Sequence, residues 1–458
     1  MKIFFGHPRA LFLIASLQMW ESFSYYGMRS ILILFLTSSL LYSDDSAYTL
    51  YAVYISLIEI GGVLGGFLAD RYFGARKSIY IGALVITAGH LSMMAIPFSE
   101  LCLFVGLSLI AAGSALFRVN CATLLGEFYE KDDPRLQAGF TVYYSALNVG
   151  AFFATILCGL LGEAFGIHYG FSLAGFGMLM GLIMFVSGRK LLEDKGLSIN
   201  TKNTKSKLGI YLVILTIPLS FCVISYAEFT MHMLPIVLLA ILSYVMFKAM
   251  SDHPKRKKDI LLILAATILL SLFYACEELI GSSLVLFAER FVDRNIFGFT
   301  IPSSTLNSVN PITIIILGAI LSTVVVNRRH VFDSFRYIGY AFLIMSGAFT
   351  LLLLGNLAAL IGAFILISAA ELFIGPVVYA LCTKLAPSNM RGQSMGIVML
   401  GYSLAGLMSG YLGKYLMVSD EGVNSFYSGF TAIGIVTAVS GLLLVIGVTI
   451  GKKILRQI

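Results

Sequence analysis

The sequence predicts an all-α integral membrane protein. Hydrophobic residues make up 58% of the 458 residues and charged residues only 12%, and the mean hydropathy is +0.91. Soluble globular chains carry charge at about a quarter of their positions, so this composition indicates that the main solvent of the chain is lipid. A membrane-spanning helix needs roughly 20 apolar residues, and on that basis the chain contains about fourteen apolar segments.

The order of these segments predicts three parts. Six segments precede a polar stretch at residues 188–207, which has no apolar period and indicates a flexible linker. Two segments follow it and end at the basic run 253–258, and six more complete the chain. We therefore expect a six-helix bundle over residues 1–188, a linker with two additional helices over 189–258, and a second six-helix bundle over 259–458. Two six-helix halves are the architecture of the major facilitator fold.

Basic residues predict the topology. Loops with Arg71, Arg76 and Lys77, or with the run 255–258, alternate with loops such as 98–100 that carry almost no Lys or Arg. By the positive-inside rule, both termini are expected to be cytoplasmic, and an even number of segments agrees with this. The apolar run after the short basic start is too long for a signal peptide, so the first helix is expected to remain in the protein.

Composition and motifs also disfavour other classes of function. The net charge of +7 is distributed over short loops and forms no basic face with interleaved aromatics, which argues against nucleic-acid binding. The six cysteines show no metal-like or disulfide-like spacing and are expected to be free packing thiols. The sequence has no Gly-rich phosphate loop with Lys and no metal-spaced His cluster. We expect no enzymatic activity, no cofactor and no metal, and an ion gradient as the energy source.

Ionisable residues inside the apolar segments carry the functional prediction. A charge within the bilayer is costly, so each of these residues indicates a function. Paired charges at mid-depth most often line a route for a polar solute or a proton, which predicts a transporter. The residues are Glu21, Arg29, Glu59, Arg118, Glu278 and Glu371.

Motifs along most of the chain resemble those of the proton-dependent oligopeptide transporters, a branch of the major facilitators, and occur in the same order. They lie at residues 21–29 (ESFSYYGMR), 65–74 (GGFLADRYFG), 117–120 (FRVN), 138–150 (AGFTVYYSALNVG), 278–290 (ELIGSSLVLFAER), 310–311 (NP) and 371–392. Two additional helices between the halves resemble bacterial members of this family. The resemblance implies a bacterial inner-membrane protein, and we expect the monomer to be functional.

A zwitterionic peptide needs cations on one wall of its site and a carboxylate on the other. Arg29 and Arg118 in the N-terminal half meet the first need, and Glu278 and Glu371 in the C-terminal half meet the second. The resemblance implies that the arginines lie near the substrate carboxylate and Glu371 near its amine. It also assigns peptide contacts to Tyr25, Tyr26, Asn148 and Asn310, and places Tyr274 where the family has a Trp.

Departures from the family pattern concern proton coupling. The first-span motif normally has two glutamates followed by an arginine, at positions held here by Gln18, Glu21 and Ser22. The family's fourth-span Lys is Arg118, which can anchor an anion but cannot relay a proton. A second-span Tyr is replaced by Glu59. We therefore assign proton coupling to Glu21 and Glu59.

Three interpretations of Glu59 remain open. A buried carboxylate near a cation can titrate usefully, so Glu59 can bind the coupling proton. Alternatively, it forms a fixed salt bridge that neutralises Arg118. In the third interpretation, the extra acid rejects peptide carboxylates and admits a cationic or amine-rich solute.

Gating residues are predicted at two places. Asp70 and Arg71, at the end of the second segment, resemble the facilitator gating motif, although they would serve equally as topology anchors. Pro376 removes a hydrogen bond in the tenth span and would let that helix bend. His90 is expected to be a hydrogen-bonded packing residue rather than a proton site.

The sequence thus predicts proton-coupled import of di- or tripeptides, or of a related amino-bearing solute, by alternating access. The expected partners are a peptide-like substrate, protons and the lipid bilayer. The alternative is a divergent facilitator that moves another polar solute, such as a polycarboxylate or a metal-chelating metabolite, without proton coupling.

Overall fold

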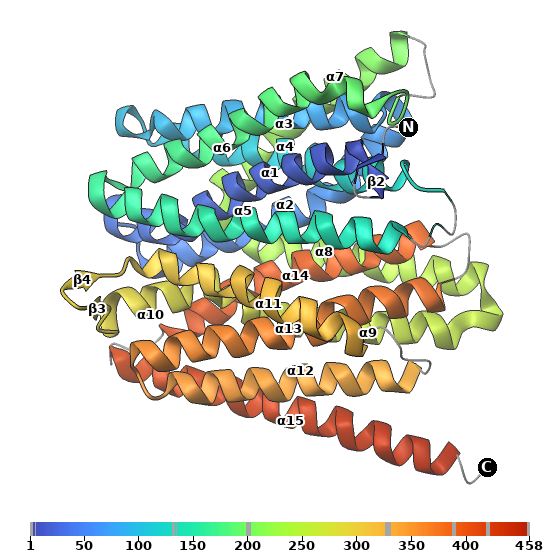
Figure 1. The fold of residues 1–458 in the computed structure, drawn as a ribbon. Coiled ribbons are helices and arrows are strands. Elements are labelled where there is room, and N and C mark those ends of the chain that lie inside the picture. The colour runs from blue at the N-terminus through green and yellow to red at the C-terminus, as the bar shows by residue number, and fades with distance from the viewer. Residues whose placement is uncertain are drawn as a thin grey trace. The chain divides into compact units, whose positions relative to one another are not determined.

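The computed structural model describes residues 3–4, 6–130, 133, 135–197, 203–325, 331–386, 391–417 and 422–455. Part of the predicted linker and Pro387 of the last motif lie outside these residues. The described chain is nearly all helical (Figure 1). It divides into two compact units: unit 1 comprises Met1–Leu41 and Val53–Thr230, and unit 2 comprises Tyr42–Ala52 and Met231–Ile458.

Unit 1 is built from the helices of the N-terminal part of the chain. Helix α1 packs against α5 and α6, and α3 packs against α4 and α6. A glycine with φ +111°, Gly166, permits the tight turn from α5 into α6. The helices are α1 Arg9–Leu34, α2 Asp44–Leu68, α3 Ala75–Met94, α4 Leu101–Gly126, α5 Arg135–Phe165, α6 Ile167–Gly188 and α7 Asn203–Ser225. Helix α2 also contributes its first turns to unit 2.

Unit 2 contains the remaining long helices. Helix α12 packs against α13 and α15, and α9 packs against α14. Figure 1 shows α12 and α15 side by side, in orange and red. The helices are α8 Ala227–Asp252, α9 Lys257–Glu277, α10 Ser283–Phe291, α11 Val309–Val325, α12 Val331–Leu352, α13 Leu357–Leu385, α14 Arg391–Leu416 and α15 Val423–Leu455.

Short elements join the long helices. Two antiparallel pairs of strands are formed by β1 Ile3–Phe4 with β2 His7–Pro8, and by β3 Asn295–Ile296 with β4 Phe299–Thr300. The π-helices are η1 Phe35–Ser39 and η2 Ala69–Phe73, and the 3-10 helices are η3 Ile96–Phe98, η4 Arg189–Leu192, η5 Pro254–Arg256, η6 Glu278–Gly281 and η7 Ser303–Ser308.

The fourteen expected membrane segments correspond to fourteen long helices in the described residues. Twelve are long and apolar enough to cross a membrane. The other two, α1 and α3, have 26 and 20 residues, and polar residues such as Glu21 and His90 lower their hydropathy. The chain is therefore a multi-pass membrane protein.

The two additional helices pack differently. Helix α7 packs against α4, where Val213 contacts Leu68, Phe73 and Leu116 of unit 1. Most of α8 belongs to unit 2, where the hydroxyl of Tyr411 donates to the carbonyl of Met231 at 2.9 Å. The boundaries of the three predicted parts remain a prediction about domain organisation.

Two glycines let helices of unit 1 approach at backbone distance. A Cβ added at Gly150 of α5 would overlap the carbonyl oxygen of Met19 in α1. A Cβ added at Gly65 of α2 would overlap the carbonyl oxygen of Ala115 in α4, and the amide of Asn120 donates to the Gly65 carbonyl at 3.3 Å. These approaches fix α1 against α5 and α2 against α4, which positions the polar residues described below.

We predict that Gly150→Ala destabilises the protein by about 1–3 kcal/mol, because the added methyl must push two backbones apart. Thermal unfolding in detergent measures the loss. Gly447→Ala in α15 is the matched control, because nothing lies within 4 Å of its added Cβ. Equal melting temperatures for the two variants would contradict the assigned close approach.

Candidate substrate and proton site

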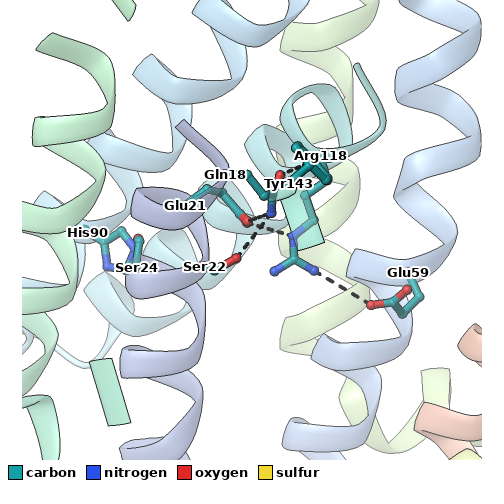
Figure 2. A network of polar contacts seen from close by, with 8 residues as sticks. All are labelled: Gln18, Glu21, Ser22, Ser24, Glu59, His90, Arg118 and Tyr143. Atoms are coloured by element: carbon teal, nitrogen blue, oxygen red, sulfur yellow. Dashed lines mark hydrogen bonds and ion pairs between the residues drawn. The ribbon is translucent and has the colours of Figure 1, made fainter. Parts of the chain in front are cut away.

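Arg118 of α4 is the centre of the polar cluster in unit 1 (Figure 2). Its Nε donates to Oε1 of Glu21 at 2.7 Å, and its Nη1 lies 3.8 Å from Oε1 of Glu59. The guanidinium carbon also lies 3.9 Å from the ring centre of Tyr25. Helices α1, α2 and α4 thus bring two carboxylates and an aromatic face to a single cation.

The two carboxylates differ in their surroundings. The Glu21 side chain is 2% exposed, and its second oxygen accepts from Nε2 of Gln18 at 3.0 Å. The Glu59 side chain is 27% exposed, and its contact with Arg118 is longer. Charge-assisted bonds on both oxygens hold the Glu21 carboxylate, whereas Glu59 is accessible to solvent or solute.

Gln18 links this cluster to α5. Its amide nitrogen also donates to Oγ of Ser22 at 3.2 Å, and its amide oxygen accepts from the hydroxyl of Tyr143 at 2.6 Å. Sequence reasoning noted Gln18 and Ser22 only as departures from the family motif, and it did not identify Tyr143 as a site residue. Tyr143 lies within the 138–150 motif, and this position could have identified it.

Arg29 lies on α1 with the two predicted tyrosines. Its guanidinium carbon is 5.9 Å from the ring centre of Tyr25 and 5.8 Å from that of Tyr26. Tyr25 therefore has a cation–π contact with both arginines, which gathers two positive charges around one ring. Asn148 of α5 donates its amide to the carbonyl of Tyr144, one turn earlier, at 2.9 Å.

His90 is buried on α3, and its Nε2 lies 2.6 Å from Oγ of Ser24 in α1 (Figure 2). The hydrogen bond expected for a packing histidine is therefore present.

In unit 2, Glu371 of α13 is held by two neutral donors. The hydroxyl of Tyr274 in α9 lies 3.4 Å from Oε1, and the amide of Asn310 in α11 lies 3.2 Å from Oε2. The structure thus brings three of the predicted substrate residues together. Sequence reasoning missed Tyr402, whose ring centre lies 4.6 Å from that of Tyr274.

The remaining predicted residues lie elsewhere on the helices. Glu278 begins the 3-10 turn η6 between α9 and α10 and is half-buried. Asp70 and Arg71 are exposed on the π-helix η2. Pro376 lies inside α13, which continues through it. The substrate, proton and gating roles of all these residues remain predictions.

Ion pairs hold the acidic first turn of α2 within unit 2. The guanidinium of Arg290 makes a two-pronged contact with Asp44, with both distances 2.7 Å. Lys414 of α14 lies 2.9 Å from Asp45. These contacts explain why this turn of α2 groups with unit 2 although its other turns lie in unit 1.

Comparisons with known proteins agree on one family. A family model described as "POT family" matches residues 76–427. A dipeptide and tripeptide permease A of Pectobacterium carotovorum is 28% identical over 465 residues, covering 96% of this chain and 91% of that protein. An uncharacterized transporter of Bacillus subtilis is 28% identical over 487 residues, covering 100% of this chain and 97% of that protein. The crystal structure of a peptide transporter POT with alafosfalin matches with a TM-score of 0.85 and 26% identity, covering 97% of this chain and 95% of that chain.

We predict that Glu21→Gln destabilises the protein far more than Glu59→Gln. Removing the buried Glu21 carboxylate deprives Arg118 of its shorter ion pair and costs up to about 3–5 kcal/mol, whereas the partly exposed, longer contact with Glu59 contributes about 0–1 kcal/mol. Melting temperatures of the two variants in detergent give the order. The reverse order would show that Glu59 is the structural counterion of Arg118.

Proposed function

The chain belongs to the POT family, and on that premise we propose that it imports di- and tripeptides together with protons by alternating access. The family match, the dipeptide and tripeptide permeases among its relatives and the peptide transporter structures support this proposal. We also propose that the protein resides in a bacterial inner membrane with both termini in the cytoplasm and that the monomer is functional.

The observation that carries the proposal is that unit 1 contains a cationic cluster and unit 2 contains an anionic one. Arg29 and Arg118 gather around Tyr25 in unit 1, and Glu371 accepts from Tyr274 and Asn310 in unit 2. A zwitterionic peptide has a carboxylate that matches the arginines and an ammonium that matches the glutamate. Tyr26, Asn148 and Glu278 are proposed as additional substrate contacts.

Proton coupling is proposed to depend on competition for Arg118. Nη1 faces Glu59 at 3.8 Å, while Nε is bonded to the more deeply buried Glu21. When Glu59 takes up a proton, its attraction for Nη1 falls, and this side of the guanidinium becomes available to the substrate carboxylate. In this scheme Glu59 carries the proton, and Glu21 remains a fixed counterion that keeps Arg118 in place.

Gating is proposed at three places. Asp70 and Arg71 lie at the end of α2 that carries basic loops, and Pro376 interrupts the hydrogen bonds of α13. The ion pairs of Asp44 with Arg290 and of Asp45 with Lys414 lie at the opposite end of α2. Their exposed positions suit contacts that break and re-form during a transport cycle.

Uptake of labelled dialanine and trialanine into proteoliposomes tests the function. The vesicle interior is made alkaline, and the control has no pH gradient. We expect accumulation above equilibrium that a protonophore collapses. Absence of peptide uptake by correctly folded protein would favour transport of a different polar solute, and uptake that is indifferent to the gradient would exclude proton coupling.

We predict that Glu59→Gln removes the pH dependence of peptide uptake and leaves counterflow exchange intact, because the amide cannot take up the proton. Uptake between about pH 5 and 8, with exchange measured in parallel, checks this result. Glu163→Gln, an exposed position on α5, is the control and should behave like the unaltered protein. Unchanged pH dependence in Glu59→Gln would assign the proton to another group, with Glu21 next.

We predict that Glu371→Gln weakens dialanine binding by roughly 10- to 100-fold, because a charge-assisted contact with the ammonium contributes about 1.5–3 kcal/mol. Binding is measured by competition with labelled peptide. N-acetyl-dialanine, which lacks the ammonium, should bind the variant and the unaltered protein equally. Equal loss for both ligands would indicate that Glu371 supports the fold of the site rather than the amine.

A further inference from the structure

A chain of hydrogen bonds runs from α5 to the ionic centre of unit 1 (Figure 2). The hydroxyl of Tyr143 donates to Oε1 of Gln18 at 2.6 Å, and Nε2 of Gln18 donates to Oε2 of Glu21 at 3.0 Å. The other oxygen of Glu21 accepts from Nε of Arg118 at 2.7 Å. Tyr143 is therefore connected to Arg118 through two intervening side chains.

The donors and acceptors of this chain run in one direction. An ionised carboxylate only accepts hydrogen bonds, so the Gln18 amide must turn its nitrogen toward Glu21. The amide oxygen then faces α5 and needs a donor, which the Tyr143 hydroxyl supplies. The amide nitrogen also donates to Oγ of Ser22 at 3.2 Å. Both hydrogens and the oxygen of the amide are thus used, and all of these bonds favour the same orientation.

Burial makes this orientation depend on Tyr143. Gln18, Glu21 and Ser22 are buried, and the Tyr143 side chain is nearly so. A buried amide oxygen that loses its donor costs free energy, because water does not replace the lost partner. A flipped amide would instead place the oxygens of Gln18 and Glu21 against each other. Without the Tyr143 hydroxyl, neither orientation of the Gln18 amide satisfies all of its polar atoms.

Backbone packing brings the Tyr143 hydroxyl to Gln18. Gly150 follows Tyr143 by two helical turns on α5. A Cβ added at Gly150 would overlap the carbonyl oxygen of Met19, which is the neighbour of Gln18 on α1. The distance between α1 and α5 is therefore set by a contact between the two helices themselves, and the hydroxyl does not depend on a loop for its position.

We propose that Tyr143 is a positioning residue for Arg118. Its hydroxyl orients Gln18, and Gln18 in turn holds Glu21. The held carboxylate fixes the guanidinium, whose Nη side receives the substrate carboxylate. This last step rests on the proposed function, whereas the earlier steps do not depend on the solute. Tyr143 does not contact the substrate in this scheme; it raises the affinity for the carboxylate end by fixing Arg118 before the substrate arrives.

The test uses the full chain in detergent, with dialanine and alanyl-alanine amide as probes. The second probe keeps the ammonium and lacks the carboxylate. Y143F removes only the hydroxyl, and Q18M removes the hydrogen bonds of the amide at similar side-chain length; the two are also combined. The matched control is Y169F, which removes the hydroxyl of an exposed tyrosine on α6. Equilibrium titration gives the dissociation constant of each probe.

We expect Y143F to weaken dialanine by roughly three- to tenfold, the loss typical of one hydrogen bond, and to leave the amide probe unchanged. Y169F should change neither constant. In the Q18M background, Y143F should cause no further loss, because the hydroxyl acts through Gln18. If Y143F does not fold, Q18M alone should show the same selective loss of dialanine, and an equal loss of both probes in Q18M would contradict the proposal.

Two results with folded Y143F would overturn the proposal. Equal weakening of both probes would indicate a general change in the fold, which does not distinguish the carboxylate. A loss of dialanine that persists at full size in the Q18M background would show that Tyr143 acts on the substrate directly or by another route.

Failure of the proposed function gives a different result, in which the unaltered protein binds both probes equally or binds neither. Melting temperatures then decide the positioning of Gln18. Y143F and S22A should lower the melting temperature by less than the sum of their separate effects, because each removes a bond of the same amide. Y169F and S22A should be additive. Additive losses for Y143F and S22A would overturn the positioning role.

Discussion

The partly buried positive charge of Arg118 is the constraint on which the polar interior of unit 1 depends. A guanidinium in a protein does not give up its proton, so a membrane bundle that contains it must supply compensating groups. Here they come from two other helices, as Glu21 and the Tyr25 ring of α1 and Glu59 of α2. The close contact at Gly65 brings α2 against α4, so that Glu59 reaches Arg118 with a side chain of ordinary length, and the contact at Gly150 holds α1 against α5.

This arrangement divides two roles between the two glutamates. Glu21 has donors on both oxygens and little exposure, and it makes the shorter contact with Arg118. Glu59 has a longer contact and greater exposure, so breaking its contact with Arg118 costs less free energy. Because Arg118 stands where the family has a lysine, the cation at this position cannot exchange a proton, and in the proposed scheme Glu59 has that role. Gln18 and Ser22 fit this division, because they are neutral groups that orient Glu21.

Sequence reasoning identified the fold and the charged centre but missed the neutral groups around it. Apolar length and the cost of buried charge identify Glu21, Glu59 and Arg118 without knowledge of helix rotation. Tyr143 bonds to Gln18, and Tyr402 contacts Tyr274. Both contacts depend on the rotation of each helix about its own axis. The sequence does not reveal that rotation when a helix is apolar on all sides. The mean hydropathy of α1 also falls below the level typical of a membrane span, because α1 contains the polar residues of the cluster.

The two clusters, each considered within its own unit, differ in how much attraction an arriving charge gains. Tyr274 and Asn310 orient Glu371 as neutral donors that preserve its negative charge, so an ammonium arriving there adds an attraction. Arg118 already faces two carboxylates, so a substrate carboxylate arriving there replaces an attraction that exists before binding. An added cation at Glu371 therefore gains more than an added anion at Arg118. In the proposed coupling scheme, an anion at Arg118 gains affinity when Glu59 is protonated, and by linkage the bound anion favours that protonation.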